Sequence, residues 1–132
     1  SATPDIAEEV AGEVDGQILP AIAADDAATF GRGAEAVGRF NGAWYAGEQG
    51  GVYRPPVGEI VDALGESSAI YGAGQSSWGP TVYAVTDAEN ADDARAAGEA
   101  ALEAAGQRGT VQVTTAQNSG ASVAEDVDDG VP

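Results

Sequence analysis

A glycine-rich run near the middle of the chain, GAGQSSWGPTVYAV at residues 72–85, constrains the fold more than any other feature. Gly72, Gly74 and Gly79 surround a polar stretch, and residues 80–86, which follow, are β-branched and aromatic. The pattern predicts strands at 69–71 and 80–86 with a glycine-rich loop between them. The loop has two interpretations: its free amides and hydroxyls bind phosphate oxygens, or it is a hairpin turn whose serines are only solvated.

The spacing of the large apolar residues predicts helices on both sides of this hairpin. A first helix begins after Thr3, with an expected bend at its glycines, and carries the four-residue repeat Ile6, Val10, Val14 and Ile18. Further helices are predicted from Asp25 or Asp26 onward, over 57–64, and over 92–105 with Gly106 as the C-cap. Strands are predicted at 110–115 and 120–123, and a mobile acidic tail at 124–132. The order predicts an α+β domain over residues 1–123, with a largely antiparallel sheet packed with helices.

The charge of the chain excludes some classes of partner. It has 22 acidic and 5 basic residues, all of the latter arginine, and a formal net charge of −17. Such a charge argues against nucleic acid and anionic membranes as partners. An acidic, lysine-free surface suits molar salt, where charges are screened over about 3 Å. We therefore expect a protein from the cytoplasm of an extreme halophile.

The residue types that are missing exclude several kinds of chemistry. The chain has neither cysteine nor histidine, which removes disulfides, the usual zinc sites and serine–histidine nucleophiles. It shows no spacing typical of a metal site and no apolar run long enough to span a bilayer. We therefore predict no metal ligand and no cofactor held by this domain alone.

Three segments carry a resemblance to a known family. The string GQSSWGPTVY at 74–83 resembles the third glycine-rich motif of the GHMP-kinase superfamily. In its individual residues it is similar to the β-ribofuranosylaminobenzene 5′-phosphate synthase family. The segment NGAWYAGEQGGVYRPP at 41–56 is similar to the QGG-containing stretch of that family. Near the C-terminus, NSGA at 118–121 resembles the family's closing turn.

This resemblance implies a ferredoxin-like GHMP-kinase C-terminal domain. In the family, phosphoribosyl pyrophosphate condenses with 4-aminobenzoate and releases carbon dioxide and pyrophosphate, in the pathway to methanopterin. The resemblance also implies a separate N-terminal domain with its own phosphate loop, and Mg²⁺ in the complete enzyme. The expected partners are a phosphorylated small molecule, the N-terminal domain and a second copy of the chain.

The same motifs supply the candidate site residues. From the glycine loop they are Gly74, Gln75, Ser76, Ser77, Trp78 and Gly79, and from the QGG segment Gln49, Gly50, Gly51 and Arg54. Arg54 is either a phosphate ligand or a salt-bridge partner, and Trp78 either stacks on an aromatic substrate or covers the core. No catalytic residue can be named from the sequence. Two other functions stay open: a small-molecule kinase of the same superfamily, and a binding domain without chemistry.

Overall fold

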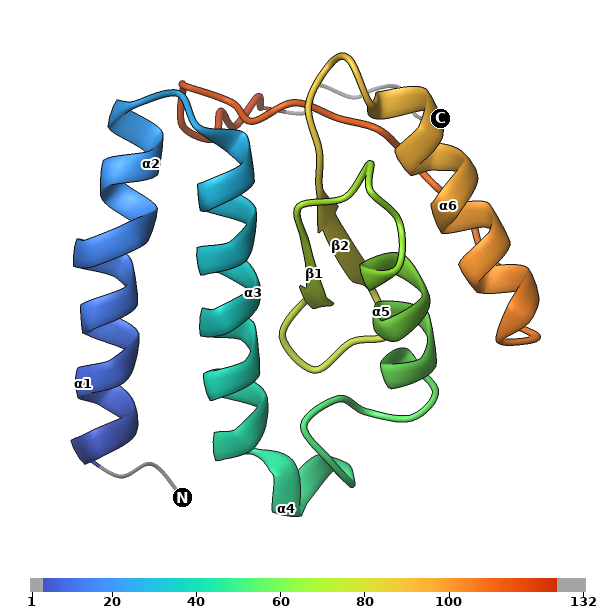
Figure 1. Cartoon of the computed structure of the whole chain (residues 1–132), viewed down its shortest axis with the longest axis horizontal. Coiled ribbons are helices and arrows are strands. Elements are labelled where there is room, and N and C mark those ends of the chain that lie inside the picture. The colour runs from blue at the N-terminus through green and yellow to red at the C-terminus, as the bar shows by residue number, and fades with distance from the viewer. Residues whose placement is uncertain (1–3, 126–132) are drawn as a thin grey trace.

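The computed structural model describes residues 4–125, which form six α-helices, one π-helical segment and a two-stranded sheet (Figure 1). The elements are α1 (Pro4–Glu13), η1 (Val14–Ile18), α2 (Leu19–Ala23), α3 (Ala27–Trp44), α4 (Ala46–Gln49), α5 (Val57–Gly65), β1 (Gly72–Gln75), β2 (Val82–Val85) and α6 (Ala91–Ala104). The sheet lies between α3 on one side and α5 and α6 on the other, and α1 lies on the far side of α3 (Figure 1). This arrangement confirms an α+β domain with an antiparallel sheet packed with helices.

The first predicted helix is present, and its irregularity is a π-helical segment. η1 contains Gly16, interrupts the helix after α1 and leads directly into α2. Its last residue, Ile18, packs against Gly33 of α3, where a Cβ atom would lie 2.6 Å from Ile18 Cγ1. The predicted cap at Thr3 lies outside the described residues.

Helix α3 forms despite its glycines because its ends and faces are held by other groups. Of the two predicted caps, Asp26 is the one used: its carboxylate accepts from the Thr29 amide at 3.1 Å and from the Thr29 hydroxyl at 2.6 Å. Further along, Gly31 lies against Gly72 of β1 so closely that a Cβ on Gly72 would collide with the Gly31 carbonyl. The missing side chains let this helix lie directly on the sheet.

The hydrophobic core is centred on α5, as its spacing predicts. Val57, Ile60, Val61 and Leu64 are all at most 6% exposed and form one cluster with Ala73 of β1 and Ala101 of α6. Burial of such side chains contributes about 1.5–3 kcal/mol each. This core fixes the sheet against α5 and α6.

The sheet is a β1–β2 hairpin, and its first strand is not where the sequence predicts it. The strands are antiparallel, with Gly72 opposite Val85 and Gln75 opposite Val82. The predicted strand at 69–71 is therefore wrong in position, because Gly72 and Gly74 lie within β1 and not in the loop. Both glycines are buried under neighbours that leave no space for a side chain: Gly31 covers Gly72, and the Tyr83 ring covers Gly74.

The chain after α6 also differs from the prediction. α6 and its C-terminal glycine are confirmed, with Gly106 at φ +66°. The strands predicted at 110–115 and 120–123 are wrong, since the structure shows no strand at these residues. Instead Arg95 of α6 donates to the Val111 carbonyl at 3.1 Å, and Val111 packs against Gly98.

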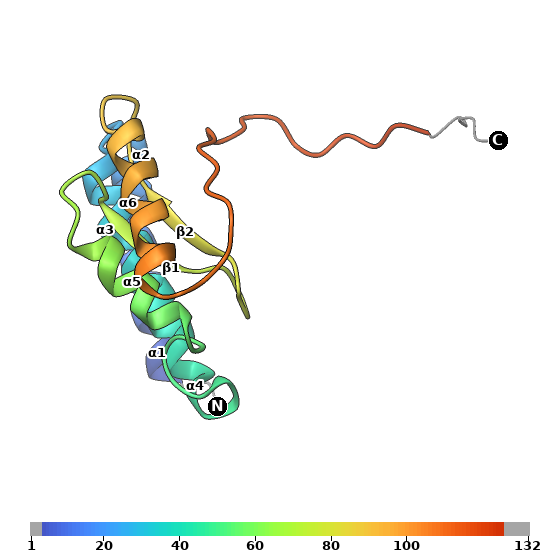
Figure 2. The same cartoon turned by 90° about the vertical axis from the view of Figure 1, so that its right-hand side faces the viewer.

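The remaining described residues lead away from the body of the protein (Figure 2). Most of the predicted tail at 124–132 lies outside the described residues. Within residues 4–125, no helix is both long enough and apolar enough to cross a membrane.

Candidate functional site

The tip of the hairpin, residues 76–81, is closed by backbone bonds of its own. The Ser76 amide donates to the Thr81 carbonyl at 2.9 Å, and the Gly79 amide donates to the Ser76 carbonyl at 2.8 Å. Ser77 and Gly79 have positive φ angles, +52° and +73°. Ser76, Ser77 and Trp78 are exposed at this tip. The tip is thus an ordered turn that presents two hydroxyls and an indole to solvent.

Two glutamine side chains connect the tip to the QGG segment. The Gln75 carboxamide donates to Gln49 Oε1 at 2.9 Å and to the Ser77 carbonyl at 2.8 Å, and it accepts from the Arg54 amide at 2.7 Å. The Gln49 carboxamide donates to the Gly51 and Val52 carbonyls at 3.0 and 2.9 Å. We call this Gln49–Gln75 pair the glutamine clasp. It uses both N–H groups and the oxygen of each carboxamide, so these side chains position the site instead of offering free donors.

The QGG segment folds as a tight turn after α4. Gly50 and Gly51 have φ angles of +91° and +149°, which strongly favour glycine at both positions. Arg54 follows and is anchored by its backbone amide to Gln75. Its exposed guanidinium makes no ion pair or hydrogen bond to any residue in the described range 4–125. The salt-bridge interpretation of Arg54 therefore finds no partner there.

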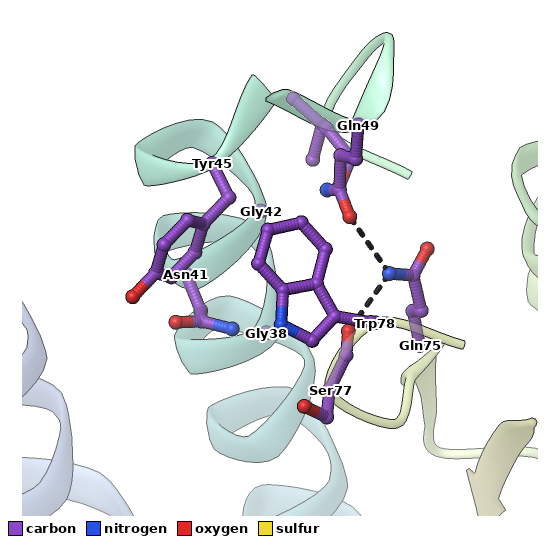
Figure 3. Close-up of a pocket in the computed structure, with 9 residues that line it drawn as sticks. Gly38, Asn41, Gly42, Tyr45, Gln49, Gln75, Ser77 and Trp78 are labelled. Carbon is purple, nitrogen blue, oxygen red and sulfur yellow. Dashed lines mark hydrogen bonds between the residues drawn. The ribbon is translucent and has the colours of Figure 1, made fainter. Parts of the chain in front are cut away.

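The clasp forms one wall of a pocket of about 210 Å³ (Figure 3). The opposite wall is the C-terminal half of α3, where Asn41 and Tyr45 present their side chains beside Gly38 and Gly42. The pocket is lined by Gly38, Asn41, Gly42, Tyr45, Gln49, Val52, Gln75, Ser77 and Trp78. We call it the polar pocket.

Three aromatic rings form a row beside the polar pocket. Tyr45 stacks on Trp44 with ring centroids 5.8 Å apart and contacts Trp78 in a tilted arrangement at 5.1 Å. Trp78 stays 48% exposed, so its indole is not a core residue. A planar ligand that enters the pocket would therefore meet an aromatic surface.

Only some of the candidate residues line the pocket. Gln49, Gln75, Ser77 and Trp78 do. Gly74, Ser76, Gly79, Gly50, Gly51 and Arg54 do not, although the clasp places the QGG segment next to the tip. Asn41 and Tyr45, on the face of α3 that carries Gly38 and Gly42, are not among the residues predicted from the sequence motifs. Gly38 and Gly42, four residues apart on a helix, were the available signal, since they leave one helix face without side chains.

A half-buried tyrosine connects the sheet to α3 near this pocket. The Tyr83 hydroxyl donates to the Ala34 carbonyl at 3.1 Å, and burial raises the pKa of this hydroxyl, with the charge of Glu35 acting in the same direction. Glu35 accepts from the Ala73 amide at 3.3 Å and pairs with Arg39 at 3.3 Å. Tyr83 is thus a neutral hydrogen-bond donor that fixes β2 to α3.

The described residues contain no group of three or more carboxylates, histidines or cysteines placed to hold a metal ion. We therefore assign no step to a metal held by residues 4–125.

Comparison with known proteins identifies the family of this domain. Residues 18–104, about two thirds of the chain, match the family model described as GHMP kinases C terminal. The match includes every residue that lines the polar pocket. No curated protein and no solved structure matches the chain. The protein therefore belongs to the GHMP kinase C-terminal domain family.

Proposed function

We propose that this chain is the substrate-binding C-terminal domain of an enzyme of the β-ribofuranosylaminobenzene 5′-phosphate synthase type. Members of the GHMP-kinase superfamily are generally enzymes, and the family match therefore supports an enzymatic role. The observation that carries the finer proposal is the glutamine clasp. It joins the two segments that resemble the synthase, GQSSWGPTVY and QGGVYR, at one aromatic-walled pocket.

The reaction makes three demands on the protein. A bond forms between C1 of the ribosyl group and the ring carbon that bears the carboxylate, while the bond from C1 to pyrophosphate breaks. The bond from the ring to the carboxylate then breaks, carbon dioxide leaves, and its electron pair restores the aromatic ring. The enzyme must bind phosphate groups, orient a planar acid and stabilise positive charge at C1.

The described residues fit two of these demands. The hydroxyls of Ser76 and Ser77 are suited to phosphate oxygens, and so is the Arg54 guanidinium, which has no partner among residues 4–125. The row of aromatic rings formed by Trp44, Tyr45 and Trp78 provides surfaces for a planar ring. Groups that stabilise charge at C1, and any Mg²⁺ bound with pyrophosphate, are assigned to the N-terminal domain that the proposal requires.

A kinase of the same superfamily is the second candidate, because the matching family model covers kinases as such. In that case the polar pocket binds the phosphate acceptor. One experiment separates the two functions. The chain, joined to its N-terminal half, is incubated with phosphoribosyl pyrophosphate and carboxyl-labelled 4-aminobenzoate, and in parallel with ATP and candidate alcohols.

The synthase proposal expects labelled carbon dioxide and pyrophosphate in equal amounts from the joined protein and neither from the 132-residue chain alone. ATP-dependent phosphorylation without carbon dioxide release would replace it with the kinase. Turnover by the chain alone would contradict the assignment of a missing half-site.

A further inference from the structure

A second and larger pocket lies next to the polar pocket, along an adjacent face of α3. It has a volume of about 580 Å³ and is lined by Ala7, Val10, Ile18, Ala34, Val37, Gly38, Asn41, Trp44 and Tyr83. Its walls come from α1, η1, α3 and β2. We call it the apolar pocket.

The lining of the apolar pocket selects an uncharged, flat ligand group. None of its residues is charged, although the chain carries a net charge of −17. Trp44 and Tyr83 supply aromatic rings, and the Tyr83 hydroxyl is already engaged with the Ala34 carbonyl. The volume lies within the range of small-molecule sites, about 300–1,000 Å³, and a dry cavity of about 150 Å³ is sufficient for benzene. The pocket can therefore accept an aromatic ring.

The two pockets share Gly38 and Asn41. Gly38 has no side chain to separate them, and the Asn41 carboxamide makes no hydrogen bond to any other residue that the structure describes. An open amide at the junction of an apolar and a polar pocket suits a ligand with an apolar ring and a polar substituent. Asn41 would then donate to that substituent.

The π-helical segment supports a role for this pocket in binding. η1 widens the helix between α1 and α2 and places Ile18 at the wall of the pocket, against Gly33 of α3. π-Helical turns inside α-helices occur frequently at functional sites.

We propose that the apolar pocket holds the aromatic ring of the acceptor, and that Asn41 binds the polar substituent of the ring where the pocket meets the polar pocket. This inference rests on the proposed function, because it places the acceptor of that reaction. Trp78 and the hairpin tip would then face the phosphorylated sugar, and Trp44 the acceptor.

The two tryptophans of the chain make the proposal testable, since Trp44 lines the apolar pocket and Trp78 the polar pocket. The protein is prepared with 5-fluorotryptophan in molar potassium chloride, and Trp44→Phe and Trp78→Phe assign its two fluorine resonances. Titration with 4-aminobenzoate should shift the Trp44 resonance in a saturable manner. A shift of the Trp78 resonance alone would place the ring in the polar pocket and overturn the proposal. The absence of a shift at both tryptophans would also overturn it.

A matched pair of α1 variants tests the position of the ring. Ala7 and Ala11 are both exposed on α1, but only Ala7 lines the apolar pocket. Ala7→Phe should lower the affinity for 4-aminobenzoate, measured from the shift of the Trp44 resonance, at least tenfold. Ala11→Phe should leave this affinity unchanged. Equal effects of the two variants would contradict the proposal.

The role of Asn41 has its own readout. Asn41→Leu should lower the affinity for 4-aminobenzoate at least tenfold, because the hydrogen bond from Asn41 to the charged carboxylate of the ligand is lost. The affinity for aniline, which has no carboxylate, should be unchanged. An equal loss for both probes would assign Asn41 to packing alone.

Failure of this proposal is distinguishable from failure of the proposed function. Saturable binding at Trp44 without carbon dioxide release by the joined protein would leave the ring site standing and remove the synthase. Carbon dioxide release by the joined protein without any shift at Trp44 would support the synthase and contradict the ring site.

Discussion

The glutamine clasp gives the sharpest test of how the site is held together. Gln75→Ala removes three hydrogen bonds, to Gln49, to the Ser77 carbonyl and from the Arg54 amide. At about 0.5–1.5 kcal/mol each they sum to about 1.5–4.5 kcal/mol, and the partial exposure of Gln75 favours the lower half of that range. We expect the free energy of unfolding, measured by urea titration in molar potassium chloride, to fall by about 2 kcal/mol.

A control and a double-mutant cycle make this prediction refutable. Gln107→Ala removes a single exposed hydrogen bond of 3.3 Å and should cost less than about 0.5 kcal/mol. Gln49 and Gln75 share one direct bond, so the cycle Gln49→Ala, Gln75→Ala should give a coupling energy of about 0.5–1.5 kcal/mol. If Gln75→Ala matches the Gln107→Ala control and the coupling is zero, the clasp does not hold the hairpin tip to the QGG segment.

Four further outcomes follow from the structure. Gly74→Ala should cost about 1–3 kcal/mol of unfolding free energy in urea titration, because its Cβ would lie 2.5 Å from the Tyr83 hydroxyl oxygen; a neutral result would contradict this packing. The pKa of Tyr83 is raised in the folded protein, so its contribution to stability should be complete below the ordinary tyrosine pKa of about 10. This contribution should decline as the pH rises through the pKa of Tyr83 in the folded state. Tyr83→Phe should remove that decline from the pH profile of the thermal unfolding midpoint. Ser76→Ala and Ser77→Ala, in the joined enzyme, should leave the unfolding midpoint unchanged while at least one lowers kcat/KM about ten- to hundredfold; normal kinetics for both would reduce them to turn residues. The unfolding midpoint should rise steadily from about 0.1 M into molar potassium chloride, and a flat or falling curve would remove the halophile interpretation.

The features that the sequence predicts correctly are those that depend on residues close together in the chain. The i, i+3, i+4, i+7 pattern of α5 was sufficient, since all four of its apolar residues enter the core. The cap at Asp26 and the terminal glycine of α6 are also local signals. These features need no knowledge of distant neighbours.

The wrong predictions concern segments whose structure is determined by contacts with residues that are distant in the sequence. Residues 110–115 have the composition of a strand, but a strand needs a free edge to pair with, and Arg95 and Gly98 hold Val111 against α6. Gly72 and Gly74 are typical of a loop, yet they lie in β1 because of Gly31 and Tyr83. In the site, the motif residues were found, but only Gly38 and Gly42 marked the partner face of α3, since nothing local connects Asn41 to the hairpin tip.

The contacts of α3 have a consequence for motion. At Gly31 and at Gly42 the backbone of the helix lies directly against the backbone at Gly72 and Val52. No rotamer can adjust at such a contact, so α3 cannot slide or roll without breaking the packing at both positions. Adaptation to a bound molecule must then come from elements other than α3, such as the exposed turn at 76–81. Relaxation dispersion measured on the protein without ligand should therefore report exchange at that turn and none along α3 between Gly31 and Gly42.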